Sequence, residues 1–131
     1  MPIDVGLDLV RIADVVEALE GAHGERYLAR IYTEREVADC RAESTIDAAR
    51  LAGRFAAKEA TLKVISSGED GVPMRDIEVR RTASGKVHLE LHRRAAEVAA
   101  AAGIRELALS ITHEAGFAAA VVMAMRSTEP D

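Results

Sequence analysis

Residues 51–63, LAGRFAAKEATLK, constrain the fold of this 131-residue chain more than any other stretch. The segment is rich in alanine, the residue with the highest helix propensity, so it predicts a helix. At about 100° per residue, Leu51 and Phe55 fall on one stripe, which should pack on a core. Lys58 and Glu59 fall within or beside that stripe, where a charge without a partner costs several kcal/mol. The helix therefore needs charged neighbours or bound ligands.

The helix alone leaves two interpretations of these charges open. Glu59 and Lys63 are four residues apart, and such pairs commonly form salt bridges on an exposed helix surface. In the alternative, Glu59 holds a bound cation while Lys58 and Lys63 hold a bound anion. For an isolated helix the salt bridge is the commoner arrangement.

Composition narrows the class of protein. The chain is 49% hydrophobic and no linker-like run divides it, so we expect a single domain over residues 1–131, with a flexible tail from about residue 127. A net charge of −5, no basic run and four aromatic residues argue against a nucleic-acid binder.

We find no basic leader and no long uncharged apolar run, which predicts a soluble, cytoplasmic protein without a membrane segment. The single Cys40 excludes an internal disulfide and a cysteine metal cluster, and within a helix among charged neighbours it is better explained as a bystander than as a nucleophile. The chemistry must therefore use oxygen and nitrogen groups.

The N-terminal residues 3–10 alternate between apolar and polar side chains. This pattern predicts a half-buried strand, with Asp4, Gly6 and Asp8 on the polar face. Gly6 leaves space for a ligand to approach, and Asp8 lies at the strand end where a helix should begin. Asp8 is therefore the better candidate ligand, whereas Asp4 should simply meet solvent.

The middle of the chain alternates helix and strand signals. Three short helices are predicted at 11–20, around 27–31 and from a Thr33–Glu36 capping box through Cys40, followed by a long helix at 45–65, a loop at 66–75 and a hairpin with strands 76–81 and 86–92. At about 1.5 Å per residue the long helix would span about 30 Å. Ser44 with Asp47 is the predicted start of that helix. His88 and His92 lie about 13 Å apart along one strand face, too far to share a metal, so we expect both to meet solvent.

The C-terminal third predicts a helix at 93–102 and two strands at 106–112 and 117–125. The last strand is apolar on both faces, which is typical of a central strand. His113 follows the first of these strands, and a single histidine at a turn against the core is more often structural than functional.

Six blocks, taken together and in this order, resemble the holo-[acyl-carrier-protein] synthases, the AcpS type of 4′-phosphopantetheinyl transferase. They are VGLDLVRI from residue 5, RIYTERE from 30, RFAAKEATLK from 54, DIEV from 76, SGK from 84 and SITHE from 110. Their joint occurrence is far more specific than any one of them, and it reverses the preference for a simple salt bridge.

The resemblance implies a fold and an activity. The fold would be α+β, with an antiparallel sheet packed on a long central helix plus shorter helices, in a trimer with sites between subunits. The activity would be Mg²⁺-dependent transfer of 4′-phosphopantetheine from coenzyme A to a serine hydroxyl of an apo acyl carrier protein, releasing adenosine 3′,5′-bisphosphate. Such a reaction supports fatty acid or polyketide synthesis.

The resemblance also implies roles for particular residues. The metal ligands would be Asp8 and Glu59, the catalytic residues Glu59, Lys63 and His113, and the coenzyme-binding residues Arg54, Lys58, Lys63, Lys86, Ser110 and His113. Glu59, directly or through a metal-bound water, would be the base for the incoming serine.

Two departures from the family pattern bear on the partners. Val87 follows Lys86 where the family usually has proline, so the coenzyme contacts of that turn should differ. The position at which the family usually has a carrier-docking arginine falls near Asp14 in this chain. We therefore expect Arg11, with Arg26 or Arg30, to meet the acidic carrier instead.

Two other classes of protein remain as alternatives. A non-catalytic coenzyme A or nucleotide-binding module would bind ligand without metal-dependent transfer. A small structural oligomer, with its charged helix paired internally, would show no thermal shift with coenzyme.

Overall fold

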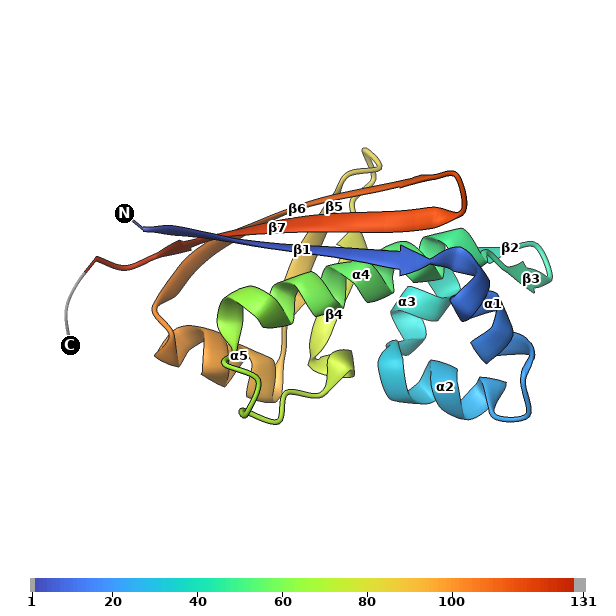
Figure 1. The fold of residues 1–131 in the computed structure, drawn as a ribbon, viewed down its shortest axis with the longest axis horizontal. Helices are drawn as coiled ribbons and strands as arrows, with labels where there is room; N and C mark the ends of the chain where they lie inside the picture. Colours follow the sequence, from blue (N-terminus) through green and yellow to red (C-terminus); the bar gives the residue numbers. More distant parts are fainter. Residues whose placement is uncertain (1, 129–131) are drawn as a thin grey trace.

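The computed structural model describes residues 2–128. In chain order the elements are β1 (Ile3–Arg11), α1 (Ile12–Glu20), α2 (Gly24–Ile31), α3 (Glu34–Asp39), β2 (Arg41–Ala42), β3 (Thr45–Ile46), α4 (Ala48–Ile65), the 3-10 turn η1 (Met74–Asp76), β4 (Ile77–Arg81), β5 (Val87–Leu91), α5 (Arg93–Ala101), β6 (Ile104–Glu114) and β7 (Phe117–Arg126). The sheet β1-β7-β6 lies along α4, with α1–α3 toward one end and α5 toward the other (Figure 1). The predicted α+β architecture is confirmed.

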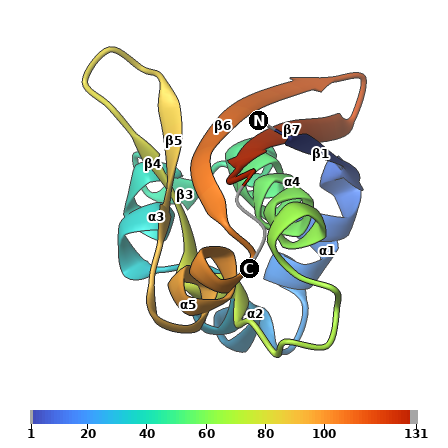
Figure 2. The ribbon, with the colours of Figure 1, turned by 90° about the vertical axis from the view of Figure 1, so that its left-hand side faces the viewer.

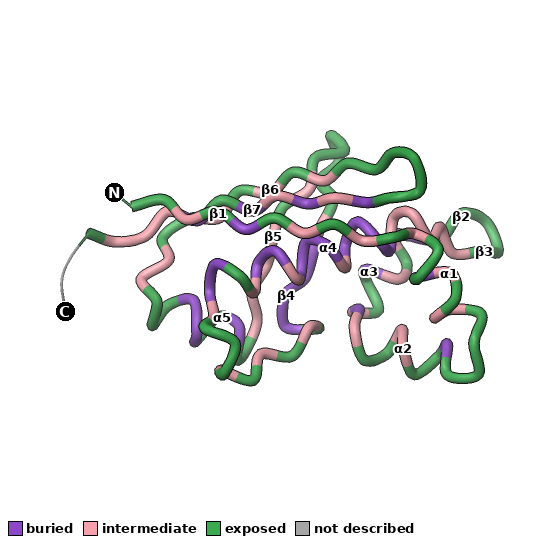
Figure 3. The backbone as a smooth tube through the Cα atoms, in the orientation of Figure 1, coloured by how far each residue is buried: buried purple, intermediate pink, exposed green. Residues whose placement is uncertain are grey.

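The long helix and the central strand form the middle of the molecule. β7 lies between β1 and β6, antiparallel to both, as its apolar sequence predicted. Its inward residues Ala118, Ala120, Val122 and Ala124 are buried. Seen from the end of the molecule, β6 curves around α4, and the β4–β5 hairpin lies on the side of β6 away from α4 (Figure 2). Much of α4 is buried (Figure 3). Within residues 2–128 no helix is both long and apolar enough to cross a bilayer.

β1 presents the face opposite to the one predicted. Its alternation is confirmed, but its four apolar residues Ile3, Val5, Leu7 and Leu9 are 57–63% exposed. The other face, with Gly6 buried and Asp8 partly buried, turns toward α4. A Cβ on Gly6 would overlap the backbone carbonyl of Ala60, so glycine is what lets β1 approach the helix this closely. The prediction that the apolar face packs on the core was therefore wrong for the single chain.

The start of the long helix lies three residues later than predicted. The side chain of Asp47 accepts hydrogen bonds from the backbone N–H groups of Ala49 and Arg50, which caps α4. Ser44 does not start the helix, because it lies in the turn of the short β2–β3 hairpin. The Thr33–Glu36 capping box is confirmed at the start of α3.

His113 lies within β6 and is exposed, so its predicted place at a turn against the core was wrong. The turn itself is Ala115 and Gly116, with φ of 54° and 84°, and a two-residue turn of this kind lets β6 and β7 pair to their ends. At the other end, Ser127 donates its backbone N–H to the carbonyl of Gly103. The predicted flexible tail falls mainly on residues 129–131, outside the described residues.

Candidate active site

Three of the predicted residues meet where β1 passes the C-terminal half of α4. The ammonium of Lys63 donates hydrogen bonds to the Asp8 carboxylate at 3.2 Å and to the Leu7 carbonyl at 2.7 Å. Asp8 and Glu59 line one cavity of about 620 Å³, and Glu59 and Lys63 line a neighbouring one of about 450 Å³. We call Asp8, Glu59 and Lys63 the carboxylate site.

The charges of the carboxylate site are unbalanced. Partial burial and the nearby Asp8 charge raise the pKa of Glu59, while Lys63 opposes this rise. The ion pair of Lys63 is with Asp8, so the expected Glu59–Lys63 salt bridge is replaced by a bridge between α4 and β1. Two carboxylates beside a cavity, with one ammonium paired to Asp8, suit a further cation. Mg²⁺ prefers oxygen ligands and keeps several waters or phosphate oxygens, so the donor set fits it.

A second group of predicted residues lies in a different cavity of about 550 Å³. Arg54, Lys86, Ser110 and His113 all line it, together with Arg50 and Arg81. We call Arg50, Arg54, Arg81, Lys86 and His113 the basic cleft, and none of the described residues that line it is acidic. Its charge suits an anionic ligand.

Arg54 is the most informative member of the basic cleft. Its side chain is only 2% exposed, yet its Nε and Nη2 have no hydrogen-bond partner among the described residues. Nη1 donates only a long 3.5 Å bond, to the Arg50 carbonyl. Buried N–H groups are almost always paired, so an unpaired guanidinium at a cavity wall suits an anionic ligand.

Arg50 and Arg81 line this cleft but were not predicted as coenzyme-binding residues. Arg50 could have been found, because it lies four residues before Arg54 and so shares its helix face. Arg81 ends β4 and lies across the hairpin from Val87. Only the way that the hairpin folds beside α4 and β6 brings Arg81 to this cleft.

Lys58 lies apart from both groups. It is fully buried, and its ammonium donates to the Glu36 carboxylate at 2.7 Å and to the carbonyls of Ile77 and Met74 at 2.5 and 3.1 Å. The other Glu36 oxygen accepts from the backbone N–H of Val79. Because an ammonium has three N–H bonds, none is left for a coenzyme phosphate. The structure therefore gives Lys58 a structural role, joining α4 to α3 and β4, and we remove it from the coenzyme-binding set.

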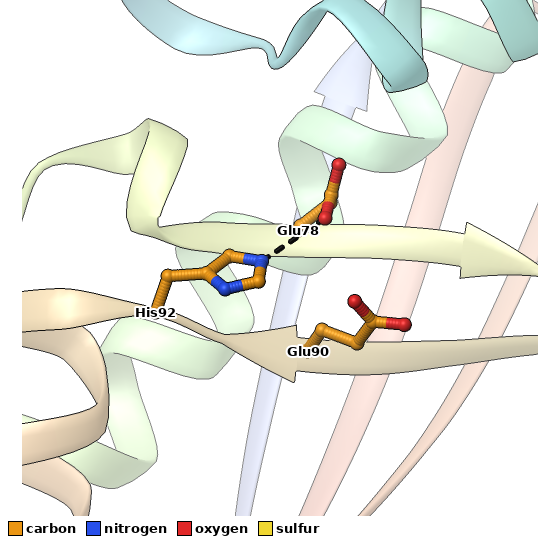
Figure 4. Close-up of side chains that lie close together, drawn as sticks. All are labelled: Glu78, Glu90 and His92. Carbon is orange, nitrogen blue, oxygen red and sulfur yellow. Dashed lines mark hydrogen bonds and ion pairs between the residues drawn. The ribbon is translucent and has the colours of Figure 1, made fainter.

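One further cluster has the composition of a metal site. Ligand atoms of Glu78, Glu90 and His92 lie within 4.8 Å of one another on the β4–β5 hairpin (Figure 4). Glu78 is buried, however, and already accepts hydrogen bonds from Thr33 and pairs with His92. Arg35 lies 3.5 Å from Glu78 and 4.0 Å from Glu90. The cluster thus has its own protein cation, and His92 is paired rather than simply solvated.

Comparisons with known proteins identify the family of the chain. Residues 4–122 match the family model of the 4′-phosphopantetheinyl transferase superfamily. A holo-[acyl-carrier-protein] synthase of Halorhodospira halophila is 43% identical over 120 residues, which is 91% of this chain and 94% of that protein. The chain also superposes on the Helicobacter pylori holo-[acyl-carrier-protein] synthase, solved in complex with coenzyme A, with a TM-score of 0.78, 27% identity and coverage of 93% and 100%.

A second solved structure, an AcpS–coenzyme A complex named as from Chronobacterium ammoniagenes, gives a TM-score of 0.80 at 28% identity, covering 97% of this chain and 99% of that one. The chain therefore belongs to the 4′-phosphopantetheinyl transferase superfamily and, within it, to the holo-[acyl-carrier-protein] synthases. The predicted resemblance is confirmed, and with it the interpretation of the chain as an enzyme rather than a structural oligomer.

Proposed function

We propose that this enzyme transfers the 4′-phosphopantetheine group of coenzyme A to a serine hydroxyl of an apo acyl carrier protein, with Mg²⁺, and releases adenosine 3′,5′-bisphosphate. The observation that carries the proposal is the carboxylate site, where Asp8 and Glu59 line one cavity. The test is the mass of an apo carrier after incubation with coenzyme A and Mg²⁺.

The chain's residues divide the work of this reaction. Asp8 and Glu59 would hold Mg²⁺, which supplies charge neutralisation on the pyrophosphate. The serine oxygen forms a bond to the pantetheine-side phosphorus as the bond to the bisphosphate breaks. Glu59, directly or through water, takes the serine proton. Lys63 stabilises the charge on the leaving phosphate.

The basic cleft would bind the nucleotide end of coenzyme A. Its unpaired Arg54 guanidinium supplies N–H donors for a phosphate. Lys86 and His113 lie on other elements that line the same cavity, and Ser110 adds a hydroxyl. Val87, where proline is usual, lines the cleft beside Lys86.

We propose a homotrimer from the exposed apolar face of the sheet. Ile3, Val5, Leu7 and Leu9 on β1 and Met123 on β7 are 46–63% exposed, and Val5 pairs with Met123 in the register. Contiguous apolar surface of this kind marks an interface. The carboxylate site and the basic cleft share no lining residue on one chain, so a neighbouring copy is what would combine them. Light scattering should give three times the chain mass of 14.1 kDa.

The carrier would approach beside the carboxylate site. Arg11 and Asp14 both line the cavity that holds Asp8 and Glu59, and the Arg11 guanidinium lies 6.0 Å from the centre of the Phe117 ring. Arg11 is therefore well placed to meet an acidic carrier near the reacting serine, with salt-sensitive association.

Removing a charge from the basic cleft should weaken coenzyme binding selectively. We expect Arg54→Met and Lys86→Met each to raise KM for coenzyme A about tenfold, since a charge-assisted hydrogen bond contributes about 1.5–3 kcal/mol. Arg54→Met should also keep or raise the melting temperature, because it removes buried N–H groups that have no protein partner. Steady-state kinetics and thermal melts measure both effects.

The matched control is Arg105→Met, on an exposed β6 position that lines none of the cavities described above. Its KM for coenzyme A should stay at the wild-type value. Unchanged KM in both cleft variants would mean that the nucleotide binds elsewhere.

A further inference from the structure

Lys63 contacts the strand that carries Asp8 rather than reaching into the open cavity beside it. Its Nζ donates to the Leu7 carbonyl at 2.7 Å and to the Asp8 carboxylate at 3.2 Å. The side chain leaves the last turn of α4 and is 52% exposed. Exposed ion pairs of this kind are weak, so these two bonds hold the ammonium only loosely.

The ammonium acts as the counter-charge of both carboxylates. Its ion pair is with Asp8, and it lines one cavity together with Glu59. Lys63 therefore does electrostatically what a divalent cation at this site would do. It also pairs with the same carboxylate, since Asp8 is both its ion-pair partner and the proposed metal ligand.

A metal ion bound to Asp8 would place a second positive charge close to this ammonium. Mg²⁺ lies about 2.0–2.1 Å from its oxygen ligands. A cation that close to Asp8 would come near an ammonium that is itself 3.2 Å from the carboxylate. Positive charges at such separations repel each other.

Lys63 has room to move away from β1. It lines the cavity of about 450 Å³ whose wall includes Ser66, Ser67 and Gly68 of the loop after α4. The four-carbon lysine stem is flexible. Rotation away from β1 would bring the ammonium toward this cavity, which Glu59 also lines.

We propose that Lys63 and the divalent metal compete for Asp8, so that metal binding releases the Lys63 ammonium from β1 into the cavity beside the Ser66–Gly68 loop, where it meets a substrate phosphate. The inference rests on the proposed function, because it takes Asp8 as a metal ligand. It goes further by making the phosphate contact of Lys63 depend on metal binding. Lys63 then neutralises Asp8 when no metal is bound, and contacts a substrate phosphate when the metal is bound.

Metal titration without coenzyme or carrier tests this competition. Mn²⁺ serves as the probe, and its binding is measured by electron paramagnetic resonance of the free ion. We expect Lys63→Met to bind Mn²⁺ about tenfold more tightly than wild type, because the metal no longer displaces an ammonium, a change of about 1.4 kcal/mol. The matched control is Arg11→Met, which removes a positive charge from the cavity that Asp8 and Glu59 line, but from a residue that has no ion pair with Asp8. Its affinity should change less than about twofold at physiological salt.

A third variant separates this inference from the proposed function. Asp8→Asn should abolish Mn²⁺ binding both in the wild-type chain and in combination with Lys63→Met. If it does so while Lys63→Met leaves the Mn²⁺ affinity unchanged or weaker, the competition is refuted and the metal site stands. If Arg11→Met tightens binding as much as Lys63→Met, only the general field acts, and the competition is again refuted. If Asp8→Asn binds Mn²⁺ as wild type does, the metal assignment and the inference both fail.

Discussion

Asp8→Asn and Glu59→Gln are each expected to lower kcat/KM for transfer by about a hundredfold to a thousandfold, the usual cost of losing an electrostatic stabiliser of the transition state. Both substitutions keep the shape of the side chain and remove the charge that a metal needs. Glu59→Gln also removes the base. Initial rates of carrier modification at saturating Mg²⁺ measure the loss, and near wild-type turnover in either variant would show that the metal assignment is mistaken.

The same pair of variants separates lost chemistry from lost folding. The pKa of Glu59 is raised above its ordinary 4.5 in the folded chain, so the folded state binds the proton more tightly than the unfolded state does. The ionised carboxylate therefore destabilises the fold at neutral pH, and this penalty fades as pH falls through the folded pKa. Glu59→Gln should melt at or above the wild-type temperature at pH 7, and the two proteins should converge near pH 4. The exposed Glu106→Gln should change neither activity nor melting.

Lys58→Met is expected to lower the melting temperature by about 10–20 °C, the largest stability effect of any single change considered. The substitution leaves the Glu36 carboxylate fully buried without its cation, which costs about 3–5 kcal/mol. Replacing Glu36 by Gln in the same chain removes the uncompensated charge and should recover part of the loss. Differential scanning calorimetry measures all three proteins.

The same variant also tests whether Lys58 contacts coenzyme A. Below its melting temperature, Lys58→Met should bind coenzyme A as wild type does, whereas Lys86→Met should bind it more weakly and melt normally. A Lys58→Met protein with wild-type melting and weak coenzyme binding would return Lys58 to the coenzyme-binding residues.

Local signals in the sequence predicted much of the fold. The apolar run of β7 indicated a central strand, and alanine content indicated α4. The Thr33–Glu36 capping box was predictable because its two hydrogen bonds join residues three apart. Where a partner lies far along the chain, the sequence carries no comparable signal. Glu36 is 22 residues from Lys58, and nothing local indicates that the two share a buried ion pair.

The orientation of β1 shows a second limit. Alternation establishes which side chains share a face, but not which face meets the core. That choice follows from the contact between Gly6 and the Ala60 backbone and leaves the apolar face of a single chain exposed. An oligomer that covers this face would account for both the alternation and the exposure.

The candidate site was predictable mainly through the resemblance. Asp8, Glu59 and Lys63 were expected together, and the structure brings them to one place. The basic cleft depends on three distant segments, α4, the β4–β5 hairpin and β6, so Arg81 could not be assigned before the fold was known. His113 was misplaced for a smaller reason: the turn needs only Ala115 and Gly116, and Gly116 was the available signal.

The mass of the carrier after incubation is the most direct test of the proposed function. Purified enzyme is mixed with an apo acyl carrier protein, coenzyme A and Mg²⁺, and the intact carrier is weighed by mass spectrometry. We predict one added phosphopantetheine per carrier, no addition when EDTA removes the metal, and no addition when the acceptor serine is replaced by alanine. A carrier whose mass stays unchanged with the wild-type enzyme, while a holo-[acyl-carrier-protein] synthase of known activity modifies the same preparation, would contradict the account.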